Sequence, residues 1–270
     1  MMPNPPRTLV VEFTKMSGAG NDFIVLDNRF YFFPVEELSE MAIRLCARRA
    51  GIGADGLLAL EESETADFRM RYLNADGSVG TMCGNGARCL ARYAANAGMV
   101  GAPLRFETDA GVYSADMLPD GVRLYIPDYQ GFAKLKEDQD GPERCYVWTG
   151  TEHIVVFVDS VAEADVATVG PRLRRTNAPA GANVNFAEVD GQGLRLRTFE
   201  KGVEAETLAC GTGATAAAAA ARLTGRLAAE TVDVHMPGGV LTIGFHADGR
   251  VRYLEGPAET VFRGTLEIPV

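Results

Sequence analysis

Cys83-Gly84-Asn85-Gly86-Ala87 and Cys210-Gly211-Thr212-Gly213-Ala214 are two copies of one phrase, Cys-Gly-x-Gly-Ala, placed 127 residues apart in the chain. Each copy opens a run of helix-forming residues. A glycine, Gly98 or Gly225, follows 15 residues after each cysteine, where a helix C-terminus is expected. The phrase therefore predicts two equivalent helices, each with a cysteine at its N-terminus.

The repeat extends beyond these helices. After each helix come a strand-like stretch, a glycine, a second alternating stretch and an Asp-Gly turn, Asp120-Gly121 in one copy and Asp248-Gly249 in the other. Upstream, a glycine precedes an apolar run in both copies. The chain is therefore interpreted as two copies of one α/β unit.

This repeat predicts two domains. The first comprises residues 1–127 with 260–270, because the strand-like end of the chain lies beyond the second copy; the second comprises residues 128–259. The charged segment from Gln130 to Arg144 is interpreted as the linker between the copies. Pro171 to Ala182 is interpreted as a polar loop.

Composition excludes several classes of function. The chain has 270 residues, a net charge of -10 and a pI near 4.9, which argues against a nucleic-acid partner. No apolar window is long enough for a membrane span, so a soluble, cytoplasmic protein is expected. Five cysteines without paired spacing and three histidines predict no metal site. Cys46, Cys89 and Cys145 are expected to be buried as small hydrophobes.

Two asparagines are candidate ligands for a substrate. Asn21 lies on the glycine-rich turn from Ser17 to Phe23, between two apolar strands, and Asn183 lies just before another strand. Both positions also suit an ordinary turn asparagine, so the alternatives stay open. The loop from Gly51 to Gly56 follows a helix beginning near Pro34, which makes a dinucleotide-binding fingerprint a poor interpretation.

The two cysteines suggest acid–base chemistry. A thiol at a helix N-terminus faces unpaired N–H groups and the positive end of the helix dipole, and both stabilise its thiolate. Main-chain donors there can also hold a carboxylate. With one cysteine on each face of an α-carbon, one thiolate could remove the α-proton while the opposite thiol delivers another. No motif for a cofactor is visible, so none is expected.

Four stretches, in this order, closely resemble the diaminopimelate epimerases: Ser17–Phe23, Asn74–Ser78, Met82–Arg88 and Glu206–Gly213. The resemblance covers the chain from about Phe13 onward. It implies a cofactor-independent isomerase that interconverts LL- and meso-diaminopimelate in lysine and peptidoglycan biosynthesis, usually as a homodimer. It also implies two pseudo-symmetric α/β domains, each a curled, mostly antiparallel, barrel-like sheet around a central helix, with the active site in the cleft between them.

The same resemblance assigns roles to residues. Cys83 and Cys210 take the positions of the acid–base pair, and His153 and Glu200 those of groups that tune the thiol pKa values. The remaining positions are implied to bind substrate: Asn21, Asn74, Gly84, Asn85, Asn183, Glu200, Lys201, Gly211 and Thr212.

The chain departs from the family pattern at two places. Thr151 stands where the family commonly has a substrate-binding asparagine, and Lys201 stands where it has arginine, in a loop that is one residue longer. Lysine keeps the positive charge but not the bidentate fork of arginine. These departures concern recognition of the far end of the substrate.

Two other functions compete with this one. A two-cysteine racemase of proline or hydroxyproline has a similar fold, but its first phrase typically carries histidine where Asn85 stands. A non-enzymatic redox or scaffold protein could join Cys83 and Cys210 in a disulfide. The related isomerases of phenazine synthesis lack the cysteine pair.

Overall fold

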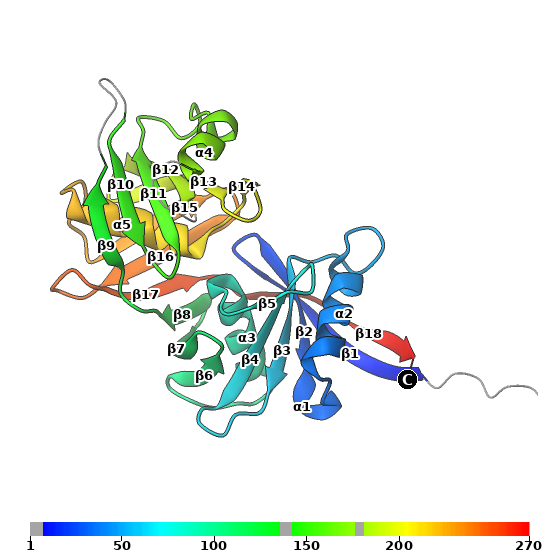
Figure 1. The fold of residues 1–270 in the computed structure, drawn as a ribbon. Helices are drawn as coiled ribbons and strands as arrows, with labels where there is room; N and C mark the ends of the chain where they lie inside the picture. The colour runs from blue at the N-terminus through cyan, green and yellow to red at the C-terminus, as the bar shows by residue number, and fades with distance from the viewer. Residues whose placement is uncertain (1–7, 136–141, 176–180, 270) are drawn as a thin grey trace, which may run out of the picture. The chain divides into compact units, whose positions relative to one another are not determined.

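The structure is a computed structural model that describes residues 8–135, 142–175 and 181–269. The chain forms two compact units, Met1–Val122 with Ala258–Val270, and Arg123–Pro257 (Figure 1). The division into domains at residues 1–127 with 260–270, and 128–259, stays a prediction. Each unit mixes helices with a mostly antiparallel sheet.

The first unit contains the elements from the N-terminal part of the chain and the last strand. They are β1 (Thr8–Gly18), β2 (Asn21–Asp27), α1 (Asn28–Tyr31), α2 (Val35–Cys46), β3 (Gly56–Glu61), β4 (Phe68–Asn74), β5 (Val79–Gly80), α3 (Gly84–Asn96), β6 (Leu104–Thr108), β7 (Gly111–Leu118) and β18 (Glu259–Pro269). The strand β8 (Gly121–Tyr125) carries the chain across the boundary into the second unit.

The second unit largely repeats this order of strands and helices. Its elements are β9 (Gln130–Lys134), β10 (Arg144–Trp148), β11 (Glu152–Phe157), α4 (Val166–Arg174), β12 (Asn183–Asp190), β13 (Gly193–Glu200), β14 (Ala205–Thr207), α5 (Gly211–Leu223), β15 (Thr231–Met236), β16 (Gly239–Phe245) and β17 (Val251–Gly256). The single helix α4 takes the place of α1 and α2, and β9 comes before the repeat.

Strand pairing confirms the internal repeat. In the first unit β1 and β2 are antiparallel, β2 and β3 parallel, β3 and β4 antiparallel, and β4 and β6 parallel. In the second unit β10 to β13 and β15 pair in the same sequence of directions. The two halves are therefore pseudo-symmetric, as predicted.

Each unit has one further strand, which lies along β1 in the first unit and along β10 in the second. The predicted return of the chain end is confirmed, because β18 runs antiparallel along β1 from the pair Thr8 and Pro269. β9 lies in the same way along β10. The prediction of a linker from Gln130 to Arg144 was therefore wrong for Gln130–Lys134. The side chains of this strand are mostly exposed, so it lacks the apolar alternation that marks a half-buried strand.

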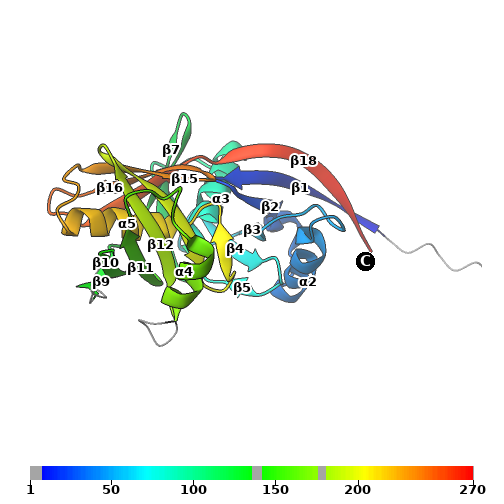
Figure 2. The ribbon, with the colours of Figure 1, turned by 90° about the horizontal axis from the view of Figure 1, so that it is seen from above.

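Each unit wraps its sheet around one helix. α3 packs against β1 to β4 and β7, and α5 packs against β10 to β13 and β15 to β17 (Figure 1 and Figure 2). The six alanines Ala216–Ala221 are all buried, and their small side chains let the surrounding strands approach α5 closely. No helix in the described part of the chain is long and apolar enough to cross a membrane.

The outer face of each sheet is covered by a second helix. α2, predicted from its apolar spacing, packs on β3 and β4, and α4 packs on β12 and β13. The polar loop predicted from Pro171 to Ala182 was wrong for its first residues, because Pro171 lies inside α4. Proline has no N–H and usually ends a helix, which explains the error. Residues 176–180 of that prediction lie outside the described residues.

Along each strand, alternate side chains face the central helix and the outer helix of the unit. In the second unit Ile154, Val184 and Phe186 belong to the apolar cluster that includes α4 residues. Since successive side chains of a strand point to opposite faces, His153 and Asn185 face α5 instead. The candidate residues of this unit thus lie on the side of the central helix.

Candidate functional site

Cys83 caps the N-terminus of α3 in an extended backbone conformation, with φ -138° and ψ 117°, and it is half-buried. The next residue, Gly84, leaves this helix start open. A Cβ atom there would meet no other described atom within 4 Å. A ligand could therefore approach the first N–H groups of α3, which have no partner within the helix.

Cys210 caps α5 in nearly the same conformation, with φ -134° and ψ 105°, and is buried. Its Sγ accepts a hydrogen bond from the backbone N–H of Gly213 at 3.4 Å and lies 3.5 Å from the Thr212 hydroxyl. The hydrogen bond from the Gly213 N–H favours a thiolate. The predicted helix positions of the two cysteines are confirmed, whereas their catalytic roles stay predictions.

The other three cysteines have a different environment. Cys46, Cys89 and Cys145 are buried, as predicted. Burial raises the pKa of Cys89 to about 12 and the pKa values of Cys46 and Cys145 to about 11. These thiols are therefore protonated near neutral pH and poor nucleophiles.

Asn21 and Asn85 meet beside the first helix start. The Asn85 amide donates to the Asn21 side-chain oxygen, and the Asn21 amide donates to Asp55 Oδ2 at 2.9 Å. Asn21 is the first residue of β2, one position after the turn on which it was expected. The structure thus brings together two predicted substrate ligands, and it adds Asp55, which the sequence interpretation had missed.

Arg88 is the second missed residue in this unit. Its side chain is fully buried, and its guanidinium donates to Asn85 Oδ1 at 2.9 Å and to the Gly84 carbonyl at 3.3 Å. Burial lowers the pKa of Arg88 to about 10, so the group is still charged at neutral pH. A fixed positive charge therefore supports the start of α3 from inside. The one sequence feature that could have pointed to Arg88 is its position at the end of the stretch Met82–Arg88.

An ion-pair network holds Asp55 in place. Arg48 Nη2 lies 2.7 Å from Asp22 and 2.8 Å from Asp55, and buried Lys15 lies 2.6 Å from Asp22. Burial alone would raise the pKa of Asp22, but hydrogen bonds from Arg48 and Lys15 keep it below its ordinary value. This network fixes the acceptor of Asn21.

Asn74 bonds within its own turn. Its side-chain oxygen accepts from the Tyr72 hydroxyl at 2.7 Å, and its amide donates to the Ser78 hydroxyl at 3.0 Å. Asn74 is the last residue of β4. Its expected contact with substrate stays a prediction.

In the second unit the structure brings Asn183 and Lys201 together. The Lys201 backbone N–H donates to Asn183 Oδ1 at 2.8 Å, and the Lys201 ammonium lies 2.7 Å from Glu152 Oε2. The Thr151 hydroxyl donates to the same Glu152 oxygen at 3.2 Å. The hydrogen bond from Lys201 lowers the pKa of Glu152. Both departures from the family pattern therefore converge on Glu152, which was not among the predicted site residues. Glu200, half-buried at the end of β13, precedes Lys201.

His153 is fully buried on β11. Burial lowers its pKa to about 3, so the ring is neutral at working pH. Its Nδ1 lies 3.0 Å from the amide nitrogen of Asn185, which is also fully buried. A neutral imidazole cannot tune a thiol by its charge. Any influence it has must come from hydrogen bonding.

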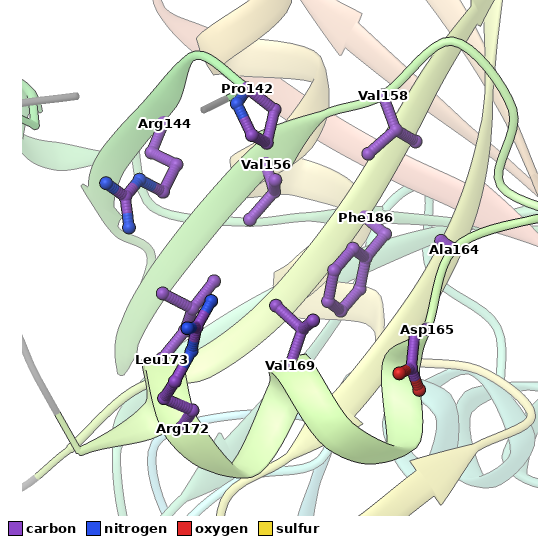
Figure 3. A pocket seen from close by; sticks show the side chains of 10 residues that line it. All are labelled: Pro142, Arg144, Val156, Val158, Ala164, Asp165, Val169, Arg172, Leu173 and Phe186. Atoms are coloured by element: carbon purple, nitrogen blue, oxygen red, sulfur yellow. The ribbon is translucent and has the colours of Figure 1, made fainter. Parts of the chain in front are cut away.

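Two features set limits on other sites. Among residues 8–135, 142–175 and 181–269, no three His, Cys, Asp or Glu side chains gather as a metal site would require. A cavity in the second unit lies between α4 and the sheet, where Val169 and Leu173 point toward Val156 and Phe186 (Figure 3). It is on the face opposite His153 and Asn185, so it does not belong to the candidate site.

Known proteins match this chain over most of its length. The family model for diaminopimelate epimerase matches residues 13–130 and 145–261. A diaminopimelate epimerase of Chlorobaculum tepidum is 45% identical over 94% of this chain and 100% of its own. One from Methanocella arvoryzae is 42% identical over 96% of this chain and 97% of its own.

Solved structures at lower identity share the fold. A phenazine biosynthesis protein of the PhzF family from Bacillus anthracis has a TM-score of 0.77 at 17% identity, covering 96% of this chain and 100% of its own. A hydroxyproline epimerase from Agrobacterium vitis has a TM-score of 0.68 at 15% identity, covering 97% and 93%. These likenesses support the two-unit fold, and the sequence matches decide the family. The chain belongs to the diaminopimelate epimerase family.

Proposed function

We propose that this protein interconverts LL- and meso-diaminopimelate without a cofactor, with Cys83 and Cys210 as the acid–base pair. One observation carries the proposal. The two cysteines cap the two central helices, each 13 residues long, at equivalent positions of the repeat. Membership in the family supports the substrate and the two-base reaction.

In the proposed reaction both cysteines act on one α-carbon. One cysteine, as thiolate, takes the α-proton and becomes a thiol, while the electron pair of the C–H bond remains on the substrate. The other cysteine, as thiol, gives its proton to the opposite face and becomes a thiolate. The stereocentre is inverted, the charges balance, and the reverse reaction exchanges the roles.

The helix starts supply the stabilisation that this reaction requires. The α-proton of an amino acid is weakly acidic, so the negative charge that develops must be spread onto the α-carboxylate. Backbone N–H groups at Gly84, Asn85, Gly211 and Thr212 are the proposed donors to that carboxylate. Removing one donor of this kind typically costs about 3–4 kcal/mol of transition-state stabilisation.

The far end of the substrate carries a second amino-acid group, and polar side chains in both units are proposed to bind it. Asn183 and Lys201 are already joined by a hydrogen bond, and Glu152 orients the Lys201 ammonium. Asn74 is a proposed contact in the first unit. A substrate without the distal group could not make the hydrogen bonds that these side chains are proposed to offer it. Sites of this kind can penalise such a loss by as much as about 10⁴–10⁵ in kcat/KM.

A homodimer and a cytoplasmic location complete the proposal. Both follow from the family resemblance.

The test is exchange of the α-proton in deuterated water. Wild-type protein should incorporate deuterium into LL- and meso-diaminopimelate and interconvert them, and it should leave lysine, proline and hydroxyproline unchanged. Inversion of free proline at a comparable rate would instead assign the chain to the two-cysteine racemases. Absence of exchange with every substrate would favour the redox or scaffold alternative.

A further inference from the structure

A buried polar triad lies under the first turn of α5. It consists of His153, Asn185 and Thr198, on three neighbouring strands, with exposed fractions of 0%, 0% and 2%. A Cβ atom on Gly213 would lie 2.3 Å from Asn185 Oδ1 and 3.2 Å from Cys210 Sγ. The Asn185 amide therefore lies directly beneath the helix start that Cys210 caps.

The hydrogen bonds of Asn185 determine where the proton of His153 lies. The Asn185 oxygen accepts from the Thr198 hydroxyl at 2.9 Å, and the Asn185 nitrogen donates to the Ile154 carbonyl at 3.2 Å. A carbonyl can only accept, so the orientation of the amide is fixed. The same nitrogen, 3.0 Å from His153 Nδ1, must also donate. In the neutral ring the proton is therefore on Nε2.

The Nε2–H group has no hydrogen-bond partner in the described part of the chain, although it is buried. A buried donor without a partner costs about 1–3 kcal/mol, so such groups in native proteins call for an explanation. A hydrogen-bond acceptor that approaches Nε2 during the reaction would satisfy this donor.

The fold itself does not require this triad. The registers of the two repeats place Phe23 where His153 stands, Leu58 where Asn185 stands, and Tyr72 where Thr198 stands. Phe23 and Leu58 are buried apolar side chains. Gly86, the counterpart of Gly213, packs its helix on Leu58. The positions of His153 and Asn185 under the central helix are thus polar in the second unit, whereas the equivalent positions of the first unit are apolar.

We propose that Asn185 is a positioning residue that fixes His153 in its Nε2–H tautomer, so that this N–H donates to an anionic group, thiolate or carboxylate, during epimerisation. The inference rests on the proposed function. Asn185 acts only through His153. The acceptor receives a neutral donor, and no proton is transferred from the ring.

The tautomer can be read directly by NMR of protein labelled with ¹⁵N-histidine. The chain has three histidines, and His153→Gln assigns the signal of interest. From about pH 6 to about pH 8 the wild type should show a neutral ring with the proton on Nε2. Asn185→Asp should move a proton to Nδ1, because a carboxylate accepts and cannot donate. Thr198→Val is the matched control. It removes a neighbour of Asn185 but leaves the amide donor, so the tautomer should not change.

Activity supplies the second measurement. Asn185→Asp and Asn185→Leu should lower kcat for diaminopimelate by about tenfold or more, as is common when a group that orients a site residue is lost. Thr198→Val should lower it less. A proton on Nδ1 in the wild type, or an unchanged spectrum in folded Asn185→Asp, would overturn the inference while leaving the epimerase assignment intact. An enzyme inactive on diaminopimelate would refute the assignment, and the tautomer result would still stand.

Discussion

His153 illustrates how burial alone changes the chemistry of one side chain. The ring has no exposed surface, and its pKa falls to about 3 because the charged form would lose its hydration. Nearby Lys201 adds to this shift, while Glu152 opposes it. The neutral ring is thus a property of the fold, and it has a measurable effect on stability.

We expect His153 to destabilise the protein as the pH falls below about 6.5. The unfolded chain binds a proton near its ordinary pKa of 6.5, whereas the folded chain stays neutral down to about 3. The unfolded state therefore binds more protons in this window. The free energy of unfolding should decrease by up to about 1.4 kcal/mol per pH unit from this residue. Urea unfolding at several pH values, compared between wild type and His153→Gln, measures the effect. Parallel pH profiles for the two proteins would contradict it.

We expect Lys201 to bind the distal amino-acid group of the substrate. Lys201→Met removes the ammonium and leaves the Glu152 carboxylate without the cation now 2.7 Å away. A hydrogen bond to a charged group is worth about 1.5–3 kcal/mol, so KM for diaminopimelate should rise about tenfold or more. Lys201→Arg is the control and should retain most activity. An unchanged KM in Lys201→Met would show that another group holds the distal end.

At the scale of elements, the two central helices depend on what lies under their first turns. Gly213 has no room for a side chain, because Asn185 Oδ1 would be 2.3 Å from a Cβ atom. At the start of the other helix, a Cβ atom on Gly84 would have no other described atom within 4 Å. Gly213 and Gly84, which hold different positions in the repeated phrases, therefore serve different purposes, packing and access respectively.

Gly213→Ala should destabilise the protein by about 1–3 kcal/mol, the usual range for overpacking in a well-packed interior. Gly84→Ala should change stability by less than about 0.5 kcal/mol, since nothing lies near the new methyl group. Thermal or urea unfolding of both variants makes the comparison, with stability rather than activity as the readout. Equal losses in the two variants would contradict the packing argument.

β18 should contribute to the first unit by covering its core. Leu266 pairs with Val11, which is fully buried, and packs against the same apolar cluster. Leu266→Ala should lower the free energy of unfolding by about 2 kcal/mol, at the low end for this change because the side chain is half-buried. Its exposed neighbour Thr265 provides the control, and Thr265→Ala should have little effect. If both variants matched the wild type, β18 would be an unimportant addition to the sheet.

How much the sequence could predict differs between elements. The phrases around Cys83 and Cys210 predicted both central helices, because a repeated motif with its own stop glycine is strong local information. β9 was missed because an exposed edge strand shows no apolar alternation. α4 was missed because Pro171 is an ordinary sign of a helix end. In both cases tertiary contacts, which a local pattern does not contain, decided the structure.

At the scale of the whole molecule, the two copies of the repeat differ in the buried residues that support their central helices. The strand directions agree between the units, but a buried Arg88 supports the first cysteine helix, and the polar triad supports the second. The sequence motifs predicted which residues touch substrate, and that prediction stays open. They could not identify Asp55 or Asn185 as supporting residues, because the contacts of these two residues join positions that only the folded chain brings together. Arg88 was missed although its partners Gly84 and Asn85 lie four and three residues before it in the same helix.

The central claim is that Cys83 and Cys210 form one acid–base pair. The most direct measurement follows α-deuterium incorporation and inversion of LL-diaminopimelate in deuterated water by Cys83→Ala, Cys210→Ala and Cys89→Ala, each checked for native folding. Loss of either catalytic thiol should abolish inversion, because one face of the α-carbon then has no proton donor or acceptor. Cys89→Ala should remain close to wild type, since that buried thiol has a pKa of about 12. Near-normal inversion by folded Cys83→Ala or Cys210→Ala would contradict the claim.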